Sequence, residues 1–142
     1  MPSALTFNEA VDLLVQEDSR YDAEAYTFLR DALETTLKKR KKSKKETAGS
    51  HVSADELLDG FRLHALKEFG PMTPTVLGYW GVRTCEDVGH LVFNLVKAGI
   101  FAKTDQDTMD AFRAGFEFEA AFVTPFRPTG KLLSAGGAGG VG

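Results

Sequence analysis

The stretch SADELLDGFRLHALKEFG, residues 53–70, carries the signals of one complete α-helix. Ser53 and Glu56 stand at the spacing of a capping box, in which each side chain accepts a hydrogen bond from a free backbone N–H at the start of a helix. Apolar residues then recur at intervals of three and four, and Gly70, followed by a proline, ends the pattern. The sequence therefore predicts a helix over residues 53–69.

Helical signals continue downstream of this stretch. TPTVLGYW (73–80) begins with Thr73 as a cap, followed by a proline at the first helical position. TCEDVGHLVFNLVKAG (84–99) has Thr84 as a cap, acids in its first turn, an apolar stripe and a terminal glycine. Two further helices are therefore expected here, joined by a three-residue turn.

Upstream, the same signals predict two more helices. Thr6 and Glu9 form another capping-box pair, and the apolar spacing after them predicts a helix over about 7–17. From Asp22 onward, an apolar stripe with acids at its beginning and lysines at its end predicts a second helix.

The second helix leads into a concentrated basic run, KKRKKSKK, residues 38–45. Helical geometry would bring like charges together at intervals of three and four, which opposes helix formation by a few tenths of a kcal/mol per pair. We therefore expect a flexible basic loop at about 38–52.

The chain carries a net charge of −3, so the remainder without the seven cations of the run carries −10. Any contact with RNA or DNA phosphate would depend on these residues: Lys38, Lys39, Arg40, Lys41, Lys42, Lys44 and Lys45. The competing interpretation is a solvated run that only aids solubility.

The C-terminal part carries weaker signals. IFAKT (100–104) and the alternating FEFEAAFVTPF (116–126) are typical of two short strands. A helix, a short turn, a longer helix and a hairpin follow one another in winged helix-turn-helix folds. The sequence thus predicts a mainly α fold, a helical domain with a winged-helix-like centre, made of three to five helices and a short C-terminal β-hairpin. Residues 1–132 would form this single domain and the glycine-rich residues 133–142 a disordered tail.

No residue pattern points to catalysis or to a cofactor. The three histidines, His51, His64 and His90, lie in a loop and two separate helices, and no nucleophile or zinc motif accompanies them. Cys85 is the only cysteine, which excludes an internal disulfide and fits a reducing cytoplasm. No apolar run approaches the length needed to cross a bilayer, so we expect no membrane partner. We expect a cytoplasmic protein that is not an enzyme and has neither a metal site nor a cofactor.

Aromatic residues supply the candidates for a protein partner. Tyr79 and Trp80 form one pair, and Phe116 and Phe118 lie in the phenylalanine-rich segment near the C-terminus. Exposed aromatic side chains anchor partners well. The alternative is that Trp80 shares the apolar stripe of its helix and fills the core.

Four segments together resemble a known group of sequences: HVSADELLDGFRLHALKEFGPM, VLGYWGVRTCEDVGHLVFNLVKAGIFAKT and FEFEAAF, with weaker support from YDAEAYTFLRDAL. They resemble a family of small proteins of unknown function associated with Planctomycetes and Verrucomicrobia. The resemblance implies a small bacterial cytoplasmic protein and no activity, cofactor or catalytic residue. The chain departs from the family pattern at two positions. The family more often has an acidic or small residue where this chain has Cys85, and a Phe where it has Val88.

These observations favour a non-catalytic macromolecule-binding protein that docks on a larger assembly. Its basic loop would contact nucleic-acid phosphate without reading sequence, because the helix at 84–99 presents Glu86 and Asp87 where a groove-reading helix needs cations. The alternative is a protein-protein adaptor or a homodimer with no nucleic-acid contact.

Overall fold

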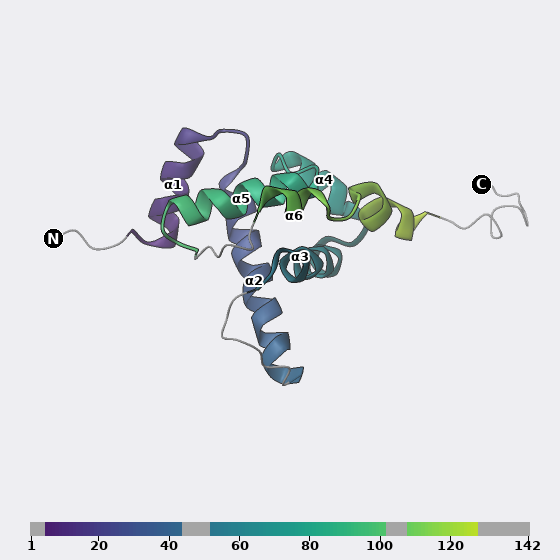
Figure 1. Cartoon of the computed structure of the whole chain (residues 1–142). Coiled ribbons are helices and arrows are strands. Elements are labelled where there is room, and N and C mark those ends of the chain that lie inside the picture. The colour runs from purple at the N-terminus through teal and green to yellow at the C-terminus, as the bar shows by residue number, and fades with distance from the viewer. Residues whose placement is uncertain (1–4, 44–51, 102–107, 128–142) are drawn as a thin grey trace, which may run out of the picture.

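The computed structural model describes residues 5–43, 52–101 and 108–127 (Figure 1). Over these ranges the chain is mainly α-helical and contains no strand. The helices are α1 (Phe7–Glu17), α2 (Ala23–Ser43), α3 (Ala54–Phe69), α4 (Thr73–Tyr79), α5 (Cys85–Lys97) and α6 (Met109–Arg113). Three single turns complete the described chain: η1 (Gly70–Met72), the π-helical η2 (Glu119–Val123) and η3 (Thr124–Phe126).

The predicted caps begin three of these helices. Thr6 of α1 and Thr84 of α5 form complete capping boxes with Glu9 and Asp87. Ser53 accepts a hydrogen bond from the Glu56 backbone N–H at 3.2 Å and so caps α3. The three predicted helix starts are therefore confirmed. They could be predicted from the sequence because a cap depends on four consecutive residues and on no distant part of the chain.

Thr73 has a different role from the predicted cap. The capping position of α4 is Met72, and the fully buried Thr73 hydroxyl lies 2.7 Å from the Gly70 carbonyl oxygen and 3.2 Å from that of Ala65. A buried hydroxyl needs such acceptors. Thr73 therefore ties the start of α4 to the end of α3.

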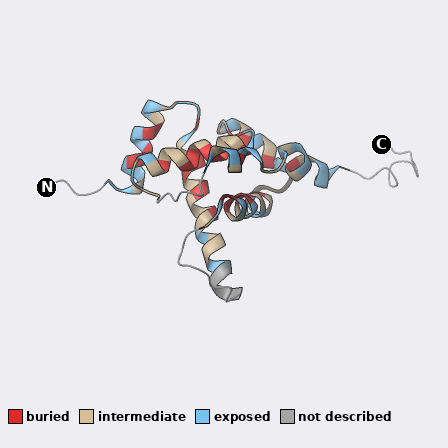
Figure 2. Ribbon diagram, in the orientation of Figure 1, coloured by how far each residue is buried: buried red, intermediate tan, exposed pale blue. Residues whose placement is uncertain are grey.

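The core is centred where α3 and α5 each pack against α2 (Figure 2). Large side chains at the centre of this region are at most 1% exposed, among them Tyr26, Leu29, Phe61, Leu91 and Leu95. α2 is the longest helix, and its last turns project beyond the other helices (Figure 1).

The predicted start of the basic loop is wrong. Residues 38–43 continue α2, and residues 44–51 lie outside the described residues. The first part of α2 packs in the core, so extending the helix into the run requires no new nucleation step. Cationic residues in the last turns of a helix also lie near the negative end of the helix dipole, which offsets the repulsion between neighbouring lysines.

The predicted hairpin is also wrong over its second strand. Residues 119–126, predicted as part of a strand, form η2 and η3 instead. Phe118 and Phe122, four residues apart, pack edge to face with ring centroids 4.9 Å apart, a spacing that one helical turn provides. In the first predicted strand, residues 102–104 lie outside the described residues, as do the predicted tail at 133–142 and His51.

Across the described ranges, no helix combines the length and the apolar character that bilayer crossing requires.

Candidate functional site

The cationic end of α2, residues 38–43, is the part of the predicted nucleic-acid site that the structure describes. Lys38 and Lys39 are exposed, and residues 40–42 continue the same helix. Successive residues of an α-helix are rotated by about 100°, so the five positions 38–42 are distributed around the whole helix axis. Lys44 and Lys45 lie outside the described residues.

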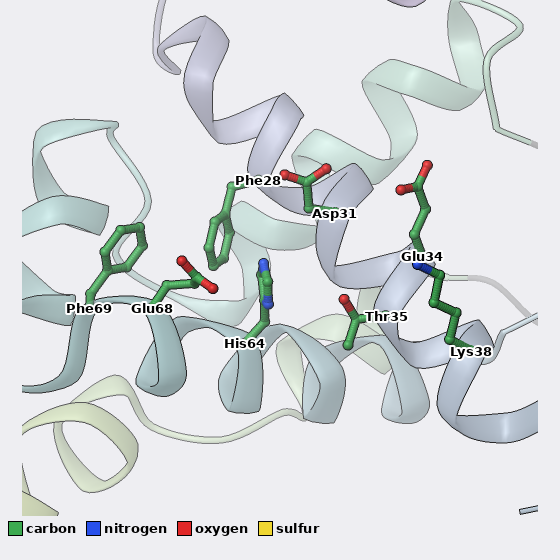
Figure 3. Close-up of a pocket in the computed structure, with 8 residues that line it drawn as sticks. All are labelled: Phe28, Asp31, Glu34, Thr35, Lys38, His64, Glu68 and Phe69. Atoms are coloured by element: carbon green, nitrogen blue, oxygen red, sulfur yellow. The ribbon is translucent and has the colours of Figure 1, made fainter. Parts of the chain in front are cut away.

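Beside this cationic end, α2 and α3 form an open groove of about 310 Å³ (Figure 3). Its floor is aromatic: the rings of Phe28 and Phe69 stack at 5.3 Å, and the ring of His64 lies 4.8 Å from that of Phe28. Three carboxylates line it, those of Asp31 and Glu34 from α2 and that of Glu68 from α3. We call this feature the acidic groove.

Lys38 belongs to both features. It lines the end of the acidic groove next to Glu34 (Figure 3) and also begins the basic run. α2 thus changes from an acidic to a basic surface within two helical turns. The sequence did not predict this groove, because its α3 residues lie 19 or more positions beyond the run.

The predicted partner residues Tyr79 and Trp80 have different surroundings. The Tyr79 side chain is 85% exposed. Trp80 is half-buried, with its ring centroid 5.6 Å from that of Phe28 and 5.7 Å from that of Phe69. Trp80 therefore supports the floor of the acidic groove and is not an exposed stacking platform, whereas Tyr79 is free to contact a partner.

The other predicted pair, Phe116 and Phe118, forms a small aromatic cluster. Both are half-buried, their rings stack at 5.7 Å, and both pack edge to face against the buried Phe122. They line a second cavity, of about 410 Å³, at the start of α5. These rings are mainly structural, since each meets a neighbour inside the molecule.

A hydrogen-bonded cluster that the sequence did not predict joins the α1–α2 linker to α5. The Tyr21 hydroxyl donates to Oδ1 of Asp87 at 2.6 Å and lies 2.8 Å from Nδ1 of His90. Asp87 also accepts from the backbone N–H groups of Arg83 and Thr84. Burial alone would raise the pKa of Asp87, but these hydrogen bonds outweigh it and the pKa is lowered.

A second set of contacts extends this cluster. Arg20 binds Asp18 through two hydrogen bonds, of 2.7 and 2.8 Å, and this interaction is the main reason why the pKa of Asp18 lies well below its usual range. The Asn94 side-chain amide donates to Asp18 and to the Tyr26 hydroxyl. Only the capping role of Asp87 was predicted from the sequence, because the contacts that join α5 to Tyr21, Asp18 and Tyr26 link residues 66 to 76 positions apart.

The remaining titratable candidates do not converge. His64 packs on Phe28 and His90 lies in the Tyr21 cluster, on separate helices. Over the described ranges, no three His, Cys, Asp or Glu side chains are placed to hold a metal ion. Cys85 is buried and donates a hydrogen bond from Sγ to the Phe116 carbonyl oxygen, and burial raises its pKa to about 11. A thiol in that environment is a poor nucleophile at neutral pH.

Comparison of the chain with protein-family models, with curated proteins and with solved structures found no significant match.

Proposed function

We propose that this chain is a non-catalytic macromolecule-binding protein whose cationic end of α2 contacts nucleic-acid phosphate. The observation that supports the proposal is the position of residues 38–43 of the basic run, at the end of α2 that projects beyond the other helices (Figure 1). Lysine and arginine side chains in such a position bind a polyanion by releasing its condensed counterions. The proposed partner of the chain is RNA or DNA, and the proposed compartment is the cytoplasm.

The proposed contact is independent of sequence. The rest of the chain carries a net charge of −10, so a polyanion is repelled outside the run. The first turn of α5 contains Glu86 and Asp87, and the Asp87 carboxylate is engaged by Tyr21 and the backbone. In this proposal α3, α4 and α5 form a winged-helix-like centre, and the chain docks on a larger assembly. Because the first turn of α5 is acidic, α5 contacts a protein of that assembly and does not enter a DNA groove.

A fluorescence anisotropy titration with RNA and with duplex DNA at two salt concentrations tests this proposal. Lys38→Gln with Lys39→Gln should weaken binding at low salt by about tenfold, since each lost phosphate contact removes one counterion-release step. The matched control is Lys67→Gln with Lys97→Gln, which removes two exposed lysines elsewhere and should have a much smaller effect. Equal losses in both variants, or no binding by the unaltered chain at low salt, would contradict the proposal.

A protein-protein adaptor or a homodimer without nucleic-acid contact is the second candidate, and one observation favours it. Tyr79 is 85% exposed and Met72, at the other end of α4, is 56% exposed. Large exposed apolar side chains of this kind serve as anchors for a protein. Pull-down from a bacterial extract with and without nuclease distinguishes the two candidates. A partner protein that the unaltered chain still captures after nuclease treatment, but that Tyr79→Ser does not capture, would favour the adaptor.

A further inference from the structure

The acidic groove and the cationic end of α2 are complementary in charge and lie on one helix. Asp31, Glu34 and Glu68 give the groove three carboxylates against the single cation of Lys38. Among the described residues, Glu34 and Glu68 have no hydrogen-bond or ion-pair partner. Asp31 has one ion pair, at a distance of 3.6 Å, with the half-buried side chain of Arg30. The carboxylates of the groove therefore remain available to outside cations.

We propose that the occupant of the acidic groove is the cationic end of α2 of a second copy of this chain. Two α2 helices that pair antiparallel about residue 36 place position 31 opposite position 41, and position 34 opposite position 38. Pairing about a point half a residue further on gives 31 opposite 42 and 34 opposite 39. In either register, the acids of each copy face the run of the other over about three helical turns.

Symmetry strengthens this choice of occupant. The pairing is isologous, so one two-fold axis uses both grooves and both cationic ends, and the contact closes at two copies. The end of α2 also projects beyond the other helices, which makes it accessible to a second copy (Figure 1).

The association should be weak and sensitive to salt. Exposed ion pairs each contribute little, and salt screens them. The same cations serve the proposed nucleic-acid contact, so RNA or DNA should compete with the second copy for the cationic end of α2.

Sedimentation equilibrium of nuclease-treated protein, over a concentration series at low and high salt, tests self-association through charge exchange. One variant, Asp31→Lys with Glu34→Lys, makes both surfaces basic, and the other, Lys38→Glu, Lys39→Glu, Lys41→Glu and Lys42→Glu, makes both acidic. Each variant alone should dimerise at least about tenfold more weakly than the unaltered chain. An equal mixture of the two should regain a salt-sensitive dimer, because each surface again meets its opposite charge.

Two controls separate this result from folding and from the proposed function. Asp12→Lys with Glu117→Lys makes the same charge change at two exposed acids elsewhere and should leave dimerisation unchanged. Circular dichroism of each variant should match that of the unaltered chain. The Asp31→Lys and Glu34→Lys variant keeps the basic run and should still bind nucleic acid, so loss of self-association and loss of nucleic-acid binding are distinguishable.

Three outcomes would overturn self-association through the groove. The first is an unaltered chain that stays monomeric at every concentration at low salt. The second is a mixture of well-folded variants that forms no heterodimer. In the third, the chain is monomeric but its groove binds a lysine-rich peptide, which would make a cationic segment of a different protein the occupant.

Discussion

Asp87 performs two structural tasks with one carboxylate. It completes the capping box of α5 through Thr84, and it accepts the hydroxyl hydrogen of Tyr21, whose side chain is 2% exposed. A buried hydroxyl left without its acceptor costs free energy of the same order as a lost cap. Asp87 thereby couples the start of α5 to the linker between α1 and α2.

Asp87→Ala should lower the free energy of unfolding by about 2 kcal/mol at pH 7, since it removes the cap of α5 and leaves His90 as the one remaining hydrogen-bond partner of the Tyr21 hydroxyl. Urea denaturation followed by circular dichroism measures this change. The matched control is Asp12→Ala, an exposed aspartate in the middle of α1, which should change stability by less than about 0.5 kcal/mol. Similar effects from both substitutions would contradict the coupling role of Asp87.

The same variant should also alter the pH dependence of stability. The pKa of Asp87 is lower in the folded chain than its usual value of about 3.9, so the folded state binds the proton more weakly than the unfolded state. The stabilisation from Asp87 is therefore complete above about pH 4 and is lost as pH falls through the folded pKa. The difference between the unaltered chain and Asp87→Ala should shrink from pH 5 towards pH 2, and a constant difference would show that the charge of Asp87 is not involved.

At the scale of elements, the packing of α2 on α3 depends on one glycine. A Cβ atom at Gly60 would overlap with Oγ1 of Thr36, whose hydroxyl donates to the Ala32 carbonyl at 2.9 Å. α3 can approach α2 this closely only without a side chain at position 60. The acidic groove lies between the same two helices, so its width depends on this contact.

Gly60→Ala should destabilise the chain by about 2 kcal/mol, because overpacking forces the helices apart. Thermal and urea unfolding measure the change. Most of the cost should disappear in a Thr36→Ala background, which a double-mutant cycle reveals. Gly78→Ala in α4 is the matched control: nothing lies within 4 Å of its added Cβ, and the better helix propensity of alanine should stabilise the chain by up to about 1 kcal/mol.

Local signals predicted the element boundaries well, except where two weak effects compete. The capped starts of α1, α3 and α5 each follow from four adjacent residues. The continuation of α2 to Ser43 did not follow, because repulsion between lysines and attraction to the helix dipole are both fractions of a kcal/mol. The strand predicted from FEFE at 116–119 was also wrong, since a four-residue alternation is compatible with a helical turn as well as with a strand.

At the scale of the whole molecule, the sequence predicted the separation of charge but not the sites that result from it. The run and the acidic remainder can be counted directly. The acidic groove needs α3 placed beside α2, and the Tyr21–Asp87 hydrogen bond joins residues 66 positions apart. Neither leaves a local pattern, because each depends on packing between helices and not on spacing within one.

The helical form of residues 38–43 changes the salt dependence expected for nucleic-acid binding. Seven phosphate contacts would give a slope of about −6 in a plot of log affinity against log salt concentration. Positions along a helix are distributed around its axis, so about half of the seven cations could face one duplex and the slope should be about −3. Anisotropy titrations of duplex DNA across a salt series measure it, and Lys38→Gln should reduce the slope by up to about 1 while Lys97→Gln leaves it unchanged. A slope near −6 would show that the run leaves its helical form on nucleic acid, and a slope near zero would show that phosphate is not what it binds.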